Sequence, residues 1–502
     1  MQLKAKTIDF EQGQNEVAIN EATAKRLDFF IGDRIQLDFN GKRIRAIVDH
    51  THALVGADEI GLFYEASQAL GAKDGDVLQV GPAPRPASLD YIRKKLDGGV
   101  LSADEINPII TDLMEQRLSR AELAIFIAAV YIKGLSTDET AALTQAIIDS
   151  GEVIIPPTTP VASEHSIGGV AGGRSSMLVT PIISSLGVCF PKTASKAISS
   201  ASATADVMGV LAPVELNVKQ VMEVLRKANA CIVWGGGVNM AAADDKLIQI
   251  RKPLHLDPQP LLISSILAKK KAEGAQYVVF DIPTGRGAKI DTIDHARDLA
   301  RAFELFGTKL GLKVMVSISD GSEPLMNTLG PALEARNVLE TLSTPAVATS
   351  PMAEKALIQS SILLHLMRGI TREEGYNIAK QQLKSGRAWE KFREIIAAQG
   401  GNDNVKPNDI EIGEHKHAVF SGVEGKVSHI DNKAISRVLR ALGAPQDVRA
   451  GMILKVAKGQ RITPGEELFE LLASKPEYLD YGIKTAKALQ VVEVERVVFD
   501  VM

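Results

Sequence analysis

From about residue 152 onward, short apolar runs alternate with segments of helical character. The runs are GVCFP (187–191), ACIVW (230–234), YVVFDIP (277–283) and LKVMVSIS (312–319). Strand-like runs that alternate with helices predict a parallel sheet covered by helices. In such a sheet, ligand-binding loops are expected at the carboxyl ends of the strands.

The rest of the chain predicts further domains around this α/β core. Its 502 residues are two to three times the length of a usual single domain. Residues 1–85 have short alternating strands, and Asn40-Gly41 between two of them is a hairpin signal, so we predict a small N-terminal β-barrel. We expect a helical domain over 86–155 and about 240–275, a mixed or parallel-sheet α/β domain over 156–239 and 276–400, and a separate C-terminal α+β domain over 410–502.

Capping boxes locate the first helices. Between about 87 and 150, three helix starts carry Ser-x-x-Glu, namely Ser102–Glu105, Ser119–Glu122 and Ser136–Glu139. Helices resume over 351–398, and the C-terminal segment is expected to contain strands with one helix near 432–442.

Charge and hydropathy exclude several classes of function. The formal net charge of −4, with both signs interspersed, gives no global attraction to nucleic acid or to an anionic membrane. The chain begins without a basic segment followed by an apolar one and has no apolar stretch of membrane-spanning length, so we expect a cytoplasmic protein. Its two cysteines lack metal-ligand spacing, and the paired histidines lack a third ligand, so no metal site is predicted.

A glycine-rich segment, Glu164–Ser176, leads into an apolar helix. Glycine permits close backbone approach, and a helix N-terminus presents free N–H groups, so anion binding is its natural use. The spacing matches neither the Walker A pattern nor the dinucleotide fingerprint, and a purely structural turn stays open.

Three further segments carry polar groups near predicted strand or helix ends. Residues 193–206 concentrate hydroxyls and a lysine, which suits a phosphate or ribose but also a solvated loop. Asp257 precedes a helix on which Ser265 and Lys269 share one face, although an Asp there is more often a cap. Residues 281–289 follow a strand and place Lys289 past its carboxyl end, where a solvated lysine is the alternative.

In this order and near this spacing, the four segments resemble the phosphorylase family that includes thymidine, pyrimidine-nucleoside and AMP phosphorylases. The N-terminal barrel and the chain length are similar to the long branch of that family. The resemblance implies that a helical domain carries the nucleoside, that an α/β domain carries phosphate, and that closure of a cleft between them excludes water. It also implies a homodimer or larger homo-oligomer.

The resemblance also assigns roles to residues. Asp257 is implied as the proton donor to the leaving base, and His165 as a second catalytic group. Substrate contacts are implied for Gly169, Ser195, Lys196, Ala197, Ile198, Ser199, Ser200, Thr204, Ser265, Lys269 and Lys289. Phosphate contacts are implied for Ser166, Gly168, Ser175, Ser195 and Thr204. Phosphate is the co-substrate, and no metal or organic cofactor is expected.

One departure from the family pattern affects the phosphate half. Glu164 stands where a phosphate-binding lysine is usual, and a reversed charge at about 4 Å costs several kcal/mol at an effective dielectric near 20. Arg174 and Lys196 could restore positive charge. We therefore hypothesise weak phosphate affinity, or another acceptor with Glu164 orienting water or a ribose hydroxyl.

Three hypotheses follow. The first is a phosphorylase of the thymidine or AMP type, acting on nucleoside 5′-monophosphates or on thymidine or uridine. The second is a catalytically altered or inactive nucleotide-binding paralogue, motivated by Glu164 and Ala203. The third and weakest is a phosphoribosyltransferase, because anthranilate-type enzymes combine similar helical and α/β parts, but no acidic metal motif is evident.

Overall fold

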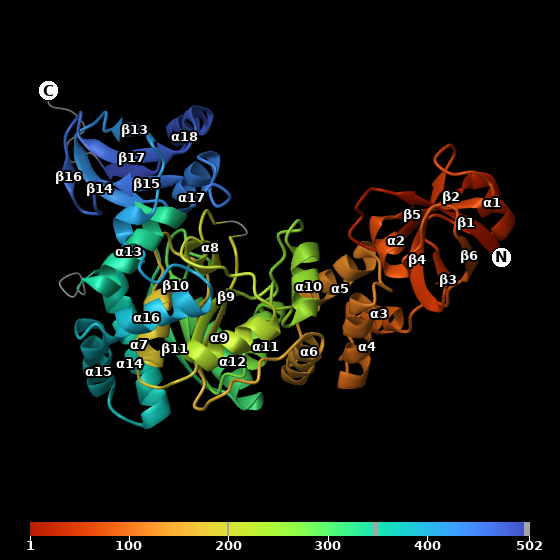
Figure 1. The fold of residues 1–502 in the computed structure, drawn as a ribbon, viewed down its shortest axis with the longest axis horizontal. Coiled ribbons are helices and arrows are strands. Elements are labelled where there is room, and N and C mark those ends of the chain that lie inside the picture. Colours follow the sequence, from red (N-terminus) through yellow and green to blue (C-terminus); the bar gives the residue numbers. More distant parts are fainter. Residues whose placement is uncertain (198–199, 345–349, 496–502) are drawn as a thin grey trace. The chain divides into compact units, whose positions relative to one another are not determined.

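The computed structural model describes residues 1–197, 200–344 and 350–495 (Figure 1). Contacts within the chain divide it into two compact units. Unit 1 comprises Met1–Gly151 and Ala241–Ser265, and unit 2 comprises Glu152–Met240 and Ile266–Met502.

The chain begins with a closed six-stranded barrel whose strand order is β1-β5-β2-β4-β3-β6. Its strands are β1 (Gln2–Ile8), β2 (Glu16–Asn20), β3 (Arg34–Phe39), β4 (Lys42–Thr51), β5 (Glu59–Phe63) and β6 (Val77–Pro82), with helices α1 (Glu21–Leu27) and α2 (Tyr64–Leu70). Asn40 and Gly41 turn β3 into β4 with φ of 47° and 78°, the left-handed pair that a two-residue hairpin requires. The predicted N-terminal barrel is confirmed.

Unit 1 also contains the start of helix α11 (Gln259–Ala272), which continues into unit 2 after Ser265. Five further helices complete unit 1. They are α3 (Ser88–Leu96), α4 (Ala103–Met114), α5 (Arg120–Lys133), α6 (Thr137–Asp149) and α10 (Ala242–Arg251). The three predicted capping boxes begin α4, α5 and α6. Glu139 serves twice, because it accepts from the Ser136 amide at 2.7 Å and pairs with the buried Lys95 ammonium at 2.7 Å. The same carboxylate therefore caps α6 and fixes α3 against it.

The centre of unit 2 is a parallel sheet. Its strands are β7 (Ala162–Ser166), β8 (Phe190–Ala194), β9 (Ala230–Trp234), β10 (Tyr277–Thr284) and β11 (Lys313–Asp320). Three of these strands pair in the order β11-β10-β7, and the other two, β8 and β9, pair with each other. A parallel bridge between Val161 and Cys189 connects the two sets. The predicted parallel-sheet α/β domain is confirmed.

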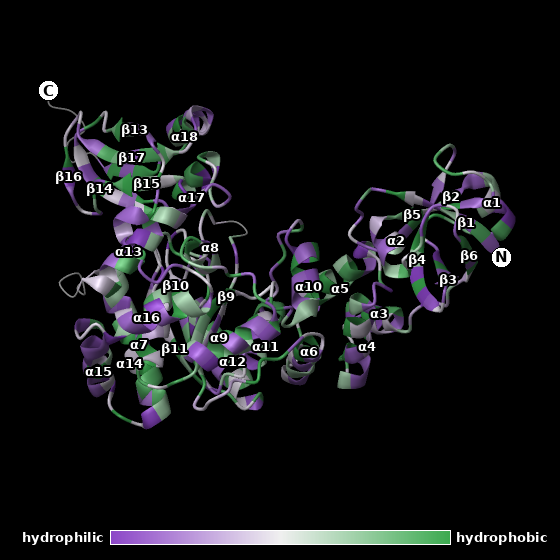
Figure 2. Ribbon diagram, in the orientation of Figure 1, coloured by the Kyte–Doolittle hydropathy of each residue, from purple (hydrophilic) through white to green (hydrophobic). Residues whose placement is uncertain are grey.

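Helices surround this sheet. They are α7 (Ser176–Ser184), α8 (Thr204–Gly209), α9 (Val218–Ala228), α11 (Gln259–Ala272), α12 (Ile293–Lys309), α13 (Pro331–Ser343), α14 (Pro351–Arg368), α15 (Arg372–Lys384) and α16 (Arg387–Ala398). Every residue of α7 is buried, whereas α15 is largely hydrophilic (Figure 2). Helix α7 is therefore a core helix, and its N-terminus follows the glycine-rich segment.

The C-terminal part of unit 2 is α+β. It contains the 3-10 turn η2 (Pro407–Asp409), strands β13 (His415–Phe420), β14 (Gly425–Ile430), β15 (Gly451–Leu454), β16 (Arg461–Ile462), β17 (Glu467–Ala473) and β18 (Val492–Glu495), and helices α17 (Asn432–Ala441) and α18 (Pro476–Ala488). The expectation of one helix was incomplete, because a second helix, α18, packs Tyr478, Leu479 and Ile483 against the core of this part. Strand β12 (Thr328–Leu329) joins β15, so this part shares a sheet with an earlier segment.

Candidate active site

In unit 1, the predicted proton donor Asp257 lies two residues before α11. Its Oδ1 atom accepts from Nη1 of Arg251 at 3.0 Å, and its side chain is 39% exposed. Arg251 ends helix α10 and is buried. A guanidinium held by packing therefore fixes the direction of the Asp257 carboxylate while leaving it accessible.

Ser265 belongs to the same polar chain. Its hydroxyl donates to Asp244 Oδ2 at 2.6 Å, and the other Asp244 oxygen lies 3.9 Å from Arg251 Nη2. Asp244 and Arg251 are seven residues apart on α10 and so face the same side of that helix. The structure thus links Ser265 to Asp257 through two buried charged groups.

Sequence reasoning missed Asp244 and Arg251. Both lie in a segment for which the sequence predicted only helix, and neither belongs to a motif. The signal in the sequence was an acidic and a basic residue two helical turns apart, shortly before Asp257. This pair indicates a site only when both residues are known to be buried.

In unit 2, Glu164, His165 and Ser166 are part of strand β7 rather than of a loop. They pair in parallel with β10, where His165 lies opposite Phe280 and Ser166 opposite Asp281. The predicted glycine-rich loop therefore begins only after Ser166. Strand pairing overrides the loop-like composition because it satisfies the backbone groups of the buried Glu164 and the half-buried His165 and Ser166.

Glu164 faces the protein interior. Its side chain has no exposed surface, and it accepts from Ser176 Oγ at 2.6 Å and from Lys192 Nζ at 3.0 Å. Burial alone raises the pKa of this carboxyl, but Lys192 and Ser176 outweigh burial, and the net pKa lies below its ordinary value. The expectation that Glu164 orients water or a ribose hydroxyl is wrong, because its oxygens are enclosed and already bonded.

A second buried pair adjoins the first. Lys270 Nζ lies 2.7 Å from Glu273 Oε1, and both side chains are at most 1% exposed. Lys192 and Lys270 also both reach the Glu164 carbonyl oxygen, at 2.6 and 3.5 Å. Two ammonium groups and two carboxylates therefore balance one another beneath the end of β7.

His165 is neutral in this environment. Burial, together with the ammonium groups of Lys270 and Lys192, lowers the pKa of its imidazole well below the ordinary value. Its ring packs edge-on against Phe280 with a centroid distance of 6.4 Å. A neutral imidazole can donate one hydrogen bond and accept another, but it carries no positive charge.

The glycine-rich loop and the Lys289 loop touch. Gly168 has φ of +97°, and a Cβ atom placed on it would lie 2.8 Å from the Lys289 Cβ. Ser166 Oγ donates to Asp281 Oδ2 at 3.1 Å, and Lys355 Nζ lies 2.7 Å from that same oxygen. The structure thus brings predicted site residues from two segments, 110 or more positions apart, to one end of the sheet.

Of the remaining predicted residues of unit 2, Lys269 lies on α11 and Gly169 in the glycine-rich loop, and the others lie after β8 or at the starts of α7 and α8. Ser175 immediately precedes α7, Ser195 follows β8, and Thr204 is the first residue of α8. Asp206 shapes the intervening loop, because its Oδ2 accepts from the amides of Ala197 and Ala203 at 2.8 and 2.9 Å. Ile198 and Ser199 lie outside the described residues.

The two cations expected to restore positive charge have other partners. Arg174 is buried, lies 2.6 Å from Glu334 and donates to the Ser202 carbonyl at 2.8 Å. Lys196 pairs with Glu215 and lies 4.6 Å from the Trp234 ring centroid. Arg174 therefore acts as an internal clamp between two loops, which corrects the sequence-based expectation.

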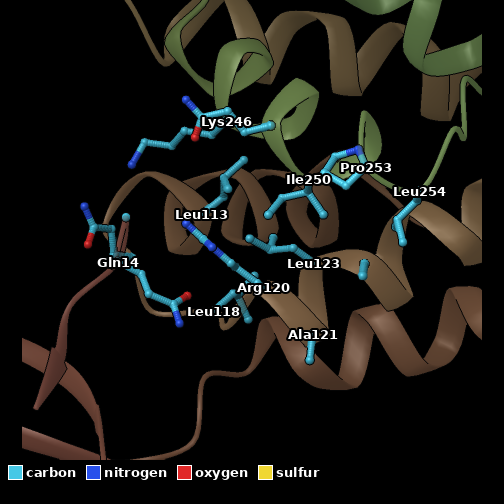
Figure 3. A pocket seen from close by; sticks show the side chains of 14 residues that line it. Gln14, Leu113, Leu118, Arg120, Ala121, Leu123, Lys246, Ile250, Pro253 and Leu254 are labelled. Atoms are coloured by element: carbon cyan, nitrogen blue, oxygen red, sulfur yellow. The ribbon is translucent and has the colours of Figure 1, made fainter. Parts of the chain in front are cut away.

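Unit 1 also contains a cavity of about 690 Å³ among the Gln14 loop, α4, α5 and α10 (Figure 3). Arg120 and Lys246 reach toward it, and Leu113, Leu123 and Ile250 form its apolar side. None of the residues predicted for the site lines this cavity.

Two absences concern the described residues alone. No group of three or more His, Cys, Asp or Glu side chains among them could hold a metal ion. Within the same ranges, no helix is long and apolar enough to cross a membrane.

Comparison with solved structures supports the fold. Anthranilate phosphoribosyltransferase from Thermus thermophilus matches with a TM-score of 0.52 and 18% identity, covering 62% of this chain and 99% of that one. The enzyme from Saccharomyces cerevisiae matches with a TM-score of 0.51 and 14% identity, covering 63% and 98%. At these identities the likeness concerns the fold alone.

Sequence comparison is more specific. Residues 89–151 match the glycosyl transferase family helical bundle domain, and residues 158–389 match the a/b domain of that family. AMP phosphorylase from Thermococcus kodakarensis is 39% identical, with 99% of both chains covered. AMP phosphorylase 1 from Archaeoglobus fulgidus is 40% identical, and AMP phosphorylase from Pyrococcus furiosus is 38% identical, each covering 100% of this chain and 99% of the relative. The chain therefore belongs to the thymidine and pyrimidine-nucleoside phosphorylase family, and within that family it resembles the AMP phosphorylases.

Proposed function

We propose that this chain is a pentosyltransferase that cleaves the N-glycosidic bond of a nucleoside 5′-monophosphate with phosphate. The products are the free base and ribose 1,5-bisphosphate. The observation that carries the proposal is the similarity to AMP phosphorylases over 99–100% of the chain, which includes the N-terminal barrel and the C-terminal α+β part.

Phosphate is proposed to bind at the carboxyl end of the sheet in unit 2. Ser166, Ser175, Ser195 and Thr204 offer hydroxyl donors there, and Gly168 offers close backbone approach. The N-terminus of the nine-residue helix α7 adds the positive end of a helix dipole beside Ser175. Substrate contacts by Gly169, Ser200, Ser265, Lys269 and Lys289 remain part of the same proposal.

Asp257 is proposed as the general acid that protonates the leaving base. A purine or pyrimidine leaves poorly as an anion, and a positioned acid typically contributes about 10²–10⁴-fold. In the structure Asp257 accepts from Arg251. Donation therefore requires that the bound base displaces this interaction, and Arg251 is then free to bond a base carbonyl or ring nitrogen.

His165 is proposed to assist as a neutral group. Because its pKa lies well below the ordinary value, it holds no proton to give at neutral pH beyond its single N–H. It is therefore suited to hydrogen-bond the substrate, whereas the proton that the base needs comes from Asp257.

Glu164 no longer motivates the inactive alternative. A carboxylate facing phosphate would repel it, but Glu164 is enclosed and paired with Lys192. The charge reversal relative to the family pattern is neutralised within the protein core. Phosphate therefore meets hydroxyl and amide donors rather than an uncompensated carboxylate.

A base-release screen tests the proposal. AMP, other nucleoside monophosphates, thymidine and uridine would each be incubated with and without phosphate, and the free base measured by chromatography. We expect phosphate-dependent release from at least AMP, and a fall of about 10²–10⁴-fold in kcat for Asp257→Asn. Asp97→Asn, which changes an exposed carboxylate at the C-cap of α3 in the same unit, is the matched control. Full activity of the Asp257→Asn enzyme would remove the assigned acid.

We also propose a homodimer or larger homo-oligomer. Ile125, Tyr131 and Ile132 on α5 are 44%, 58% and 68% exposed, and clustered exposed apolar side chains are typical of association surfaces. Native mass spectrometry of the wild type and of Ile132→Asp measures the assembly directly, and a monomeric wild type would overturn this point.

A further inference from the structure

Helix α17 of the C-terminal part carries three polar residues in one line. Asn432, Ser436 and Arg440 are spaced by four, so they project from the same face of the helix. The neighbouring side is apolar, because Ala434, Ile435, Val438 and Leu439 are buried. The line of polar residues is thus distinct from the side that holds α17 in its own core.

The first of these residues binds the glycine-rich loop. Asn432 Oδ1 accepts from the Ala171 amide at 3.3 Å, and Asn432 Nδ2 donates to the Gly321 carbonyl at 3.1 Å. One amide side chain therefore ties the loop that leads to Ser175 to the loop that follows β11.

The other two residues bind the serine loop. Ser436 Oγ accepts from the Ala201 amide at 3.1 Å. Arg440 donates to the Ser200 carbonyl through Nε at 3.1 Å and through Nη2 at 3.0 Å. Helix α17 therefore binds two consecutive residues of the loop, the carbonyl of Ser200 and the amide N–H of Ala201.

Apolar packing reinforces these hydrogen bonds. Ala201, 3% exposed, belongs to the same hydrophobic core as Ile435, Val438 and Leu439, and Ala171 packs against that core. Ala201 therefore places its methyl group in the C-terminal core, and Ala171 packs against that core, each beside its hydrogen bond to α17.

The Lys289 loop has its own anchor in the same C-terminal part. Arg286 donates to both carboxylate oxygens of Glu493 on β18, at 2.9 and 2.5 Å. Bidentate pairs of this kind fix orientation as well as distance. All three loops that carry predicted phosphate or substrate contacts in unit 2 are consequently attached to residues beyond 430.

We infer that the C-terminal part is a positioning element for phosphate, and that Asn432, Ser436 and Arg440 are positioning residues. They hold the loops at Ala171 and at Ser200–Ala201 so that Ser175, Ser195 and Thr204 face one anion. These loops have little regular structure of their own, and a misplacement of about 1 Å in such a site costs on the order of 10²-fold in rate. The inference rests on the proposed use of phosphate.

The test measures phosphate binding apart from turnover. Inorganic phosphate would be titrated by calorimetry into the full-length wild type, Ser436→Ala, Arg440→Ala and Arg440→Lys. Arg437→Ala, an exposed arginine on the same helix, is the matched control. Thermal unfolding of each variant verifies that it is folded.

We expect Kd for phosphate to rise about tenfold or more in Arg440→Ala and Ser436→Ala, to recover in part in Arg440→Lys, and to stay within twofold of wild type in Arg437→Ala. Where AMP is turned over, KM for phosphate rises while KM for AMP stays within twofold. Unchanged phosphate affinity in folded Ser436→Ala and Arg440→Ala would overturn the inference, as would a wild type that binds no phosphate. Phosphate binding by a wild type that releases no base would refute the proposed reaction alone.

Discussion

At the scale of single residues, Glu164 shows that the effect of a changed charge depends on the side chains that contact it. Taken alone, a carboxylate beside a phosphate site is repulsive. In the structure the Glu164 carboxylate accepts hydrogen bonds from Lys192 and Ser176 in the core of unit 2. Local composition cannot reveal this, because Lys192 is 28 residues away and reaches Glu164 only through the pairing of neighbouring strands.

The pair makes a prediction about stability. Glu164→Lys, which restores the lysine usual in the family, places two ammonium groups side by side in the core. We expect it to lose about 3–5 kcal/mol of unfolding free energy in denaturant titrations, and the swap Glu164→Lys with Lys192→Glu to recover much of that loss. Asp298→Lys, which reverses a charge in an exposed pair with Arg301, should cost less than about 1 kcal/mol. A Glu164→Lys protein as stable as the wild type would contradict the buried pairing.

His165 makes a prediction about pH. The pKa of the His165 imidazole in the folded protein lies well below the value of 6.5 for an unfolded chain. As the pH falls below about 7, the unfolded chain therefore binds a proton at His165 that the folded protein does not bind. The unfolded chain is then favoured on acidification, and the contribution to stability is fully present only above that window. Between pH 7 and pH 5.5, wild type should lose up to about 1.4 kcal/mol per pH unit more than His165→Gln. Denaturant titrations at each pH measure this, with exposed His295→Gln as control. Equal slopes for wild type and His165→Gln would refute the lowered pKa of the His165 imidazole.

At the scale of elements, the loops are fixed by contacts that their own sequences do not contain. Gly168 illustrates the point, since its φ of +97° and its closeness to Lys289 both exclude a side chain. Gly169 next to it has open space at its Cβ position and no positive φ. Position 168 therefore requires glycine, whereas position 169 has space for a side chain, although the sequence alone does not distinguish the two.

Paired substitutions test this difference. Gly168→Ala should destabilise the protein by about 1–3 kcal/mol because the new methyl group meets Lys289 and the backbone is strained. Gly169→Ala should stay within about 0.5 kcal/mol in stability. Thermal and denaturant unfolding of both variants measure the effect, and equal stability of the two would mean that the loop does not pack as described.

Much of the element structure was predictable, and the failures have physical causes. The capping boxes at Ser102, Ser119 and Ser136 are local signals, and the apolar runs at 230–234 and 277–283 mark buried strands directly. Strand β7 escaped prediction because its polar side chains are satisfied by distant partners. Helix α18 is different, because Tyr478, Leu479, Ile483 and Ala486 recur at helical spacing and the signal for it was present in the sequence. The contacts of α17 with two loops join residues more than 230 positions apart, which no local pattern records.

At the scale of the whole molecule, the predicted roles divide between the two units. Asp257, with Arg251, Asp244 and Ser265, belongs to unit 1, whereas the predicted phosphate residues belong to unit 2. Within unit 1, Asp257 contacts Arg251 and Ser265 contacts Asp244. A reaction between a nucleotide and phosphate needs both, since neither group alone offers an acid and an anion site.

This division predicts separable defects. Asp257→Asn should abolish most base release while leaving Kd for inorganic phosphate within twofold of wild type in calorimetry, because its side chain belongs to the other unit. A parallel loss of phosphate affinity would show that the two functions are not separated in this way.

The central claim is phosphorolysis of a nucleoside 5′-monophosphate, and one measurement tests it most directly. AMP would be incubated with purified full-length protein at increasing phosphate concentrations, and adenine and the sugar product would be quantified together. The account predicts saturable, phosphate-dependent adenine release with one ribose 1,5-bisphosphate formed for each adenine. Adenine release at an equal rate without phosphate, accompanied by ribose 5-phosphate, would contradict it.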